Sequence, residues 1–280
     1  MAREALAHLR KSAGSCQTEV TTSNRPYLGD IASLIAEHLP GPWQVTVENF
    51  ALPDRKQERL SWLWAKDLVD TLKQYPVPCG AVLRGGSGAE FLLIERPWDG
   101  QYLVGALEPG SDYTDSPVAA PRNVVATAST VASAVRTRLL PAYEHSVRLL
   151  RLYEAEADLG WARETFEPGM SEPYPTGLAS KLDEFRTHVP EFLAAIRRDA
   201  RALTADEAAL VDRIEAAFGR DRRATEESVS TDAMALWLAE GEHLIELARA
   251  IPPAIPATAR PLPPAAAPPP AAGTGHGPRR

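Results

Sequence analysis

The stretch CGAVLRGGSGAEFLLIERPWDGQYLVGAL, residues 79–107, decides the fold expected for the N-terminal half of the chain. It contains three short apolar runs separated by two glycine-containing turns, Gly85–Gly88 and Trp98–Gly100. An Asp-Gly pair between apolar runs is a strong hairpin signal, because glycine accepts the positive φ that primed turns need. The runs are apolar on both faces. We therefore predict an antiparallel three-stranded meander that is covered on both sides.

Upstream of the meander, residues 26–78 predict two helices with a strand between them. Apolar residues recur at helical spacing over 27–39, whereas Trp43, Val45 and Val47 alternate with polar residues. Asp54 is a suitable N-cap for one continuous helix whose apolar face runs on to Leu72. The predicted order is αβαβββ, with the first strand joining the meander at an edge or between helices.

After residue 110 the strand pattern stops and helical spacing dominates. A helix is predicted to begin near Pro121 and to carry Val124, Val131 and Leu139 toward the sheet, with a break or kink at Pro141. A loop is expected over 160–177, followed by helices that form a hairpin or a small bundle. The fold class is therefore α+β, with an all-helical C-terminal half.

Composition and spacing divide the chain into four parts. Residues 1–25 form a flexible N-terminal segment, residues 26–159 an α/β domain with sheet-packing helices, and residues 176–250 a helical subdomain. The last thirty residues, 251–280, contain ten prolines and almost nothing large to bury. We predict that they form a disordered, Pro-rich tail.

Charge and cysteine content exclude several classes of protein. Thirty Lys and Arg against 37 Asp and Glu give a net charge of −7, which disfavours a chain-wide nucleic-acid or anionic-membrane surface. Cys16 and Cys79 cannot make a disulfide framework, and no Cys/His spacing suggests zinc. No uninterrupted apolar run approaches the ~18 residues of a membrane span. The reducing cytoplasm is the expected location.

A glycine-rich turn is the candidate ligand loop: Arg84, Gly85, Gly86, Ser87 and Gly88. It follows a strand, as a phosphate-binding loop does. It lacks the Lys-Ser/Thr of a P-loop, however, and it leads into another strand instead of a helix N-terminus. A plain hairpin turn is the favoured interpretation, and a ligand loop is the alternative.

Trp62, Val69 and Trp98 form a candidate partner surface. On one continuous helix, Trp62 and Val69 lie away from the apolar face at Leu60, and Trp98 stands in a hairpin turn. Tryptophans outside the core are enriched at protein interfaces. The competing interpretation, which we favour, is that Trp62 packs under the C-terminal helices of the same chain.

No motif identifies a reaction. The six histidines lack metal-binding spacing, and no nucleophile motif occurs, so no catalytic residue, metal or cofactor is predicted. His145 with Glu144 or Tyr143 could form an acid/base pair, although a helix-surface histidine is more common.

The leading hypothesis is a non-enzymatic cytosolic interaction or accessory protein, which binds a protein partner or itself. The alternative is an enzyme or small-ligand binder with a pocket between sheet and helices, near Gly85–Gly88. Nucleic-acid binding through the helix at Arg197–Arg201 is a weaker alternative, because acidic neighbours surround those arginines. The predicted helical cover of the meander leaves no exposed catalytic cleft.

Overall fold

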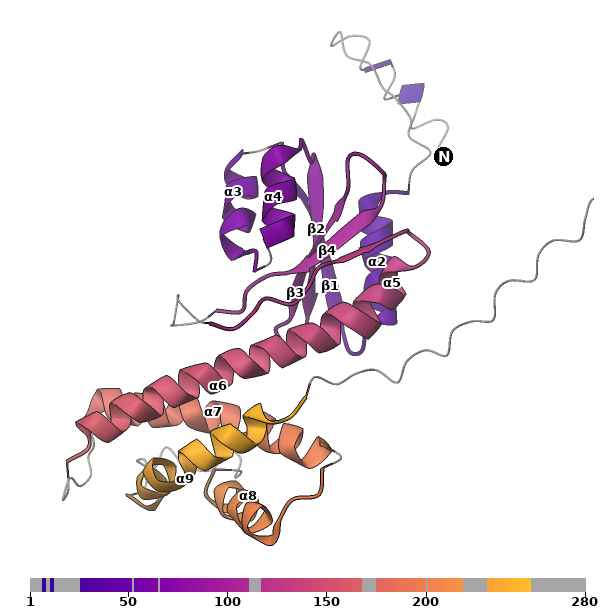
Figure 1. Cartoon of the computed structure of the whole chain (residues 1–280). Helices are drawn as coiled ribbons and strands as arrows, with labels where there is room; N and C mark the ends of the chain where they lie inside the picture. The colour runs from indigo at the N-terminus through magenta and orange to yellow at the C-terminus, as the bar shows by residue number, and fades with distance from the viewer. Residues whose placement is uncertain are drawn as a thin grey trace, which may run out of the picture.

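The computed structural model describes residues 7–8, 11–12, 26–51, 53–64, 66–110, 117–167, 175–199, 201–218 and 231–252. Nearly all of the predicted flexible N-terminal segment lies outside these residues, and so does the Pro-rich tail from residue 253 onward. The described part has the predicted α+β class, with an antiparallel sheet in the N-terminal half and helices alone in the C-terminal half (Figure 1).

The sheet contains the predicted meander and is larger than predicted. Its order follows the sequence, and every neighbouring pair is antiparallel. The strand before the meander joins it at an edge, which confirms one of the two predicted positions. The strands are β1 (Trp43–Asn49), β2 (Cys79–Gly85), β3 (Glu90–Glu95), β4 (Tyr102–Ala106) and β5 (Val124–Ala126).

The prediction of a helix over Val124–Ala126 was wrong. These residues form β5, which pairs with β4 from Tyr102 to Val104, and the helix begins only at Val131. Val124 and Ala126 are buried while Val125 between them is exposed, which is the alternation of a half-buried strand. The unpaired edge of β4 needs backbone partners, and β5 supplies them.

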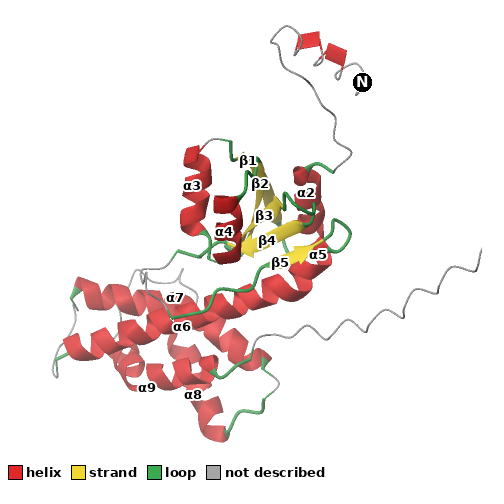
Figure 2. Cartoon of the chain, turned by 45° about the horizontal axis from the view of Figure 1, so that its top comes forward, coloured by secondary structure: helices red, strands yellow, loops and turns green. Residues whose placement is uncertain are grey.

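Helices cover both faces of the sheet, as predicted (Figure 2). One face carries Ala81, Leu83 and Leu93 and packs under α2 (Leu28–His38), α5 (Val131–Ala134) and the start of α6 (Leu140–Thr165). The other face carries Val82 and Leu92 and packs under the segment from α3 (Pro53–Trp62) to α4 (Lys66–Gln74).

The single helix predicted from Asp54 to Leu72 is broken, so that prediction was wrong. Leu63 forms a β-bridge with Leu107, and the Trp64 N–H donates to the Ala106 carbonyl at 3.2 Å. Since β5 pairs only as far as Val104, this connector covers the part of the β4 edge that β5 leaves open. The backbone groups at the β4 edge need hydrogen-bond partners, and this requirement outweighs the helical spacing of apolar residues between Asp54 and Leu72.

Helix α6 continues through the predicted break at Pro141. A π-helical turn, η1 (Val135–Leu139), lies between α5 and α6, and Pro141 stands in the first turn of α6. A widened turn is a known way to accommodate a proline, which lacks an N–H donor. The predicted loop over 160–177 was also too long, because α6 extends to Thr165.

The second half of α6 forms a helical bundle with α7 (Thr176–Arg198), α8 (Ala205–Phe218) and α9 (Thr231–Arg249). Phe185, Phe192 and Trp237 are fully buried in its core. The core also contains Leu152–Ala162 of α6, so this helix belongs to both hydrophobic cores (Figure 1). The predicted boundary between the α/β domain, 26–159, and the helical subdomain, 176–250, stays a prediction. The end of the first range belongs to α6 and packs in the bundle core.

The segment directly after α9, at Ile251, is part of the folded structure. Ile251 is buried at the edge of the bundle core, and its carbonyl accepts a hydrogen bond from Arg148 of α6 at 2.8 Å. Ile251 and Pro252, the first two residues of the predicted tail, are thus held by this helix.

Candidate functional site

An open groove of about 710 Å³ lies between the sheet and the bundle. Its walls come from the β2–β3 turn, from Pro109 and Gly110 after β4, and from facing sides of α6 and α7. The helical cover of the sheet thus leaves an exposed cleft, contrary to the expectation from the sequence. The groove exists because α6 continues beyond the sheet and carries α7 beside it (Figure 1).

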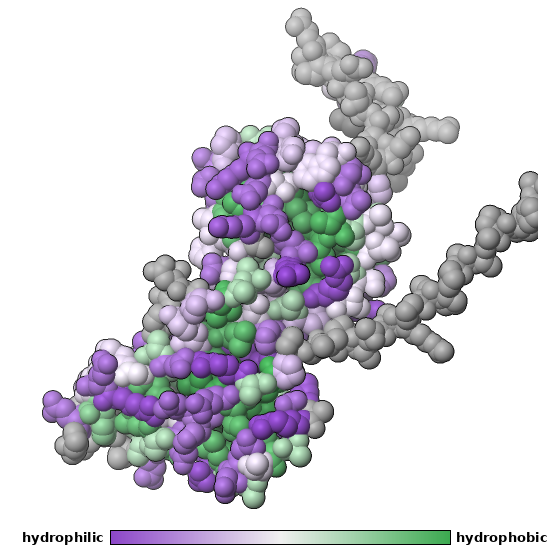
Figure 3. Space-filling view, viewed as in Figure 1, coloured by the Kyte–Doolittle hydropathy of each residue, from purple (hydrophilic) through white to green (hydrophobic). Residues whose placement is uncertain are grey.

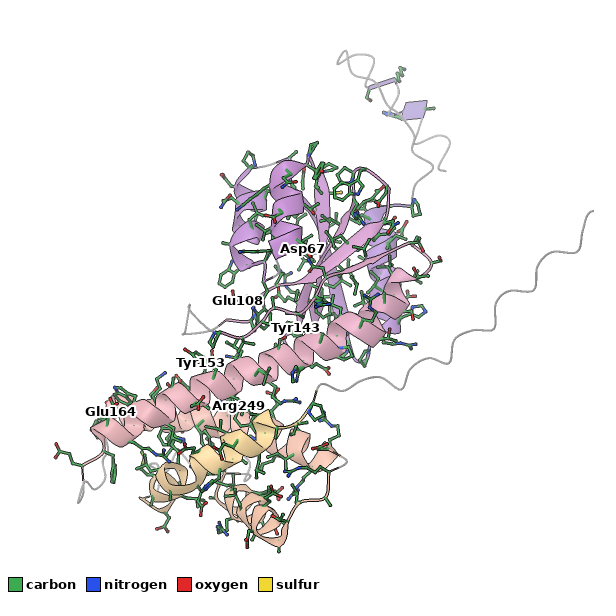
Figure 4. All side chains as sticks on the ribbon, viewed as in Figure 1. Asp67, Glu108, Tyr143, Tyr153, Glu164 and Arg249 are labelled. Atoms are coloured by element: carbon green, nitrogen blue, oxygen red, sulfur yellow. The ribbon has the colours of Figure 1, made fainter. Side chains whose placement is uncertain are left out.

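The helices contribute residues at regular helical spacing. On α6 the lining includes Glu144, His145, Arg148 and Arg151, and on α7 it includes residues from His188 to Arg198. Residues three and four apart share one face of a helix, so each helix presents a single polar stripe. Figure 4 labels Tyr143 where α6 passes the sheet, and Tyr153 and Glu164 farther along the same helix.

Arg148 is anchored within the groove wall. One guanidinium nitrogen, Nη2, lies 2.8 Å from the Ile251 carbonyl and 2.9 Å from His145 Nδ1. Because arginine only donates, His145 must accept at Nδ1, which requires the neutral ring. Burial and the Arg148 charge both lower the pKa of His145, in agreement with that form. Arg148 Nε is buried and has no hydrogen-bond partner.

Glu144 lies one turn before Arg148 on α6, and Glu191 and Arg198 line the groove from α7. Burial raises the pKa of Glu144, while the charges of Arg198 and Arg148 oppose this rise. Arg198 and Glu191 make no ion pair within 4.0 Å with any residue that the structure describes. The groove therefore holds charges of both signs, and Arg198 keeps its donors available.

A smaller cavity of about 130 Å³ adjoins the groove between α6 and α7. Arg151 closes one side, donating to the Gly110 carbonyl at 3.2 Å and to Glu154 Oε2 at 2.8 Å. Glu154 is only 8% exposed, and its other oxygen, Oε1, has no hydrogen-bond partner. Burial lowers the pKa of His188, which also lines this cavity.

A third depression, of about 370 Å³, adjoins the groove on the sheet side. It shares Gly88, Gly110 and Tyr143 with the groove and is bordered by Arg84 and Trp62. Burial raises the pKa of Tyr143 to about 12, so its hydroxyl stays protonated at neutral pH.

The structure divides the candidate ligand loop into lining and packing residues. Ser87 and Gly88 line the groove, and Arg84 lines the adjoining depression while pairing with Glu90 at 2.9 Å. A Cβ on Gly85 would lie 2.9 Å from the Trp43 ring, and Gly86 packs near Pro42. Gly88 has φ +85°, which a glycine adopts without strain. The turn is a hairpin, as favoured, and it also borders the groove.

The members of the candidate partner surface lie apart. Trp62, 50% exposed, stands at the end of the sheet near Glu108, whose N–H donates to its carbonyl. Trp98, 48% exposed, stands in the β3–β4 turn at the opposite end, against Tyr75. Val69 is partly buried against the core between them. On the face shown in Figure 3, hydrophilic residues cover much of both parts, with smaller hydrophobic areas between them.

Two of the three arginines of the nucleic-acid alternative are ion-paired, and Arg198 between them lines the groove. Arg197 pairs with Glu215, and Arg201 pairs with Glu207 at 3.1 Å. In the part of the chain that the structure describes, no three His, Cys, Asp or Glu residues are placed to hold a metal ion. None of the helices described there has both the length and the apolar character to cross a bilayer.

Sequence reasoning named His145 and Glu144, and it placed Arg198 in the candidate nucleic-acid helix, but it did not connect Arg148, Arg151, Glu154 and His188 with a site. Their polar stripes on α6 and α7 were visible, but charged stripes are typical of solvated helix faces. Comparisons with protein-family models, with curated proteins and with solved structures give no match. The function is therefore argued from the groove alone.

Proposed function

We propose that this chain is a binding protein for a small polar ligand, which lies in the groove and presents an anionic group to Arg148 and Arg198. The observation that carries the proposal is the pair of arginines on facing helices with unused donors: Arg198 has no ion pair among the described residues, and Arg148 Nε has no partner. This is the small-ligand alternative from the sequence, placed near the predicted turn.

The dimensions and chemistry of the groove support a small molecule. Its volume of about 710 Å³ falls within the range of typical ligand pockets. Arginine forks match the geometry of carboxylates and phosphates. Arg148 is already held by Ile251 and His145, so little side-chain freedom would be lost on binding.

Titration with inorganic phosphate tests the proposal. Calorimetry at low ionic strength should show saturable binding, and Arg198→Gln should weaken it by about tenfold or more, because hydrogen bonds to charged groups contribute about 1.5–3 kcal/mol. The matched control is Arg186→Gln on the same helix, whose side chain pairs with Asp183 outside the groove. It should bind phosphate like the wild type.

Equal affinities of the wild type and Arg198→Gln would contradict the proposal, and so would an equal loss in Arg186→Gln. In the latter case phosphate would respond to overall charge, and the groove would have no special role.

The interaction function predicted from the sequence is a second candidate, supported by the half-exposed Trp62. It predicts that the wild type self-associates or binds a protein partner, and that Trp62→Ala abolishes this association in analytical ultracentrifugation. A monomeric wild type that also retains no protein partner would contradict it.

A further inference from the structure

We propose that the small cavity between α6 and α7 is a subsite for a primary ammonium group, so that the ligand is a zwitterion whose ammonium meets Glu154 while its anionic group meets Arg148 and Arg198. The proposal rests on the proposed function, because it specifies which class of small molecule occupies the same groove.

Glu154 is the residue on which the subsite depends. It is 8% exposed and lines the cavity, and Arg151 occupies only its Oε2. Oε1 has no partner among the described residues. A buried carboxylate oxygen without a hydrogen bond is costly, so a donor in the adjoining cavity would be favourable.

The charges around the cavity favour a cation. Three carboxylates, of Glu154, Asp158 and Glu184, line the cavity, and Arg151 is the basic residue in the same lining. Lys181 lies 3.2 Å from Asp158 and 2.9 Å from Glu184, so its charge is shared between those two carboxylates. His188 adds no charge at neutral pH, because burial lowers its pKa. The lining therefore contains more acidic than basic side chains.

The size and donors of the subsite select the kind of cation. A cavity of about 130 Å³ accommodates a compact ammonium with its first methylene groups. A primary ammonium carries three N–H donors, whereas a trimethylammonium has none for Glu154 Oε1. No three metal-ligating side chains gather in the described residues, which favours an organic cation over a metal ion.

The spacing of the two subsites predicts the length of the ligand. Arg148 and Glu154 are six residues apart on α6, so they lie about 9 Å apart along its axis and about 120° apart around it, with Arg151 of both linings between them. Side chains shorten this span, but a ligand whose two charged groups share one carbon atom cannot reach both. We therefore expect a flexible chain of several bonds between ammonium and anion.

Calorimetric titration of matched compounds tests the inference. Alkyl phosphates are compared with ω-aminoalkyl phosphates of the same, increasing chain length. At the best length the amino compound should bind the wild type about tenfold more tightly, since it adds a charge-assisted hydrogen bond. Glu154→Gln should abolish this advantage, and N-trimethylation of the compound should abolish it as well. Glu164→Gln, exposed on the same helix and outside the cavity, should retain it.

The outcomes separate this inference from the proposed function. Equal binding of amino and plain compounds to the wild type overturns the ammonium subsite and leaves the anion site intact. Failure of both series and of inorganic phosphate to bind contradicts the proposed function itself. If Glu154→Gln does not fold, a crystal structure of the wild type with the amino compound decides. The ammonium within hydrogen-bond distance of Glu154 supports the subsite, and ordered water there instead overturns it.

Discussion

Gly105 in β4 shows how tightly the sheet is packed at the level of one residue. A Cβ at this position would overlap Asn123 Oδ1 and would lie 2.8 Å from Leu68 Cδ2 of α4. A glycine inside a strand is typical of close packing or of a bulge, and the structure shows close packing here. Gly105→Ala should lower the free energy of unfolding by about 1–3 kcal/mol because neighbours must shift. Urea denaturation measures this change.

Gly160 in α6 is the matched control, because its substitution by alanine should raise the free energy of unfolding instead of lowering it. Nothing lies within 4 Å of its hypothetical Cβ, and the residue is in the middle of a helix. Gly160→Ala should raise the free energy of unfolding by up to about 1 kcal/mol, through helix propensity. If Gly105→Ala were as stable as the wild type or more stable, as Gly160→Ala should be, the close packing at Gly105 would be refuted.

His188 makes stability depend on pH. Burial and the nearby Arg151 charge lower its pKa in the folded state, although Glu154 and Glu184 oppose them. The unfolded chain takes up a proton as the pH falls through about 6.5, before the folded chain does. The free energy of unfolding should therefore fall as the pH decreases below about 6.5, and it should be fully retained above that value.

Urea denaturation of the wild type and His188→Gln across this pH range tests the assignment. The substitution should reduce the pH dependence without abolishing it, because burial also lowers the pKa of His145. An unchanged pH dependence in the variant would show that His188 does not contribute.

At the scale of elements, α3 is attached to the sheet mainly by an ion pair. The helix contains no buried residue, but Arg59 binds both carboxylate oxygens of Glu48 in β1. The two side chains are only 14% and 13% exposed. Arg59→Leu should lower the free energy of unfolding by about 1–3 kcal/mol, because it leaves the Glu48 carboxylate without its partner.

A double-mutant cycle checks this explanation. Adding Glu48→Leu to Arg59→Leu should restore part of the lost stability, since the unpaired charge is removed. Hydrogen exchange of the α3 amides should be faster in Arg59→Leu than in the wild type. Strictly additive losses in the cycle would mean that the pair makes no specific contribution.

The elements also show where local patterns were sufficient. The Asp99-Gly100 pair and the Gly85–Gly88 turn predicted the meander correctly, because turn chemistry is local: Gly88 and Gly100 have φ of +85° and +67°. Thr204 and Glu207 have the spacing of a capping box, and the structure forms it, with hydrogen bonds in both directions. The predictions for 63–64 and 124–126 failed because the β4 edge required partners from distant segments.

At the scale of the whole molecule, α6 connects two hydrophobic cores. Leu140 and Tyr143 pack against the sheet, whereas Leu152 and Leu159 pack in the bundle. Leu159→Ala should lower the free energy of unfolding by about 2–5 kcal/mol through the cavity that it creates. Because one helix completes both cores, we expect the sheet and the bundle to unfold together.

Residue-specific hydrogen exchange in urea, followed separately for β3 and α9, measures this coupling. In Leu159→Ala both elements should lose protection in one transition, at a lower urea concentration than in the wild type. Loss of protection in α9 alone would mean that the two cores are independent.

The sequence by itself determined the α+β class, the antiparallel meander with its turns, and the helical second half. These features follow from alternation, helical spacing and glycine positions within a few residues of each other. Only the tertiary structure decided that a groove exists and which side chains line it. Arg148 and Arg198 are fifty positions apart, and the burial of Glu154 depends on how α7 packs on α6. Whether a donor or acceptor has a hydrogen-bond partner depends on the groups around it. Many of those groups come from distant parts of the chain, which meet only after folding.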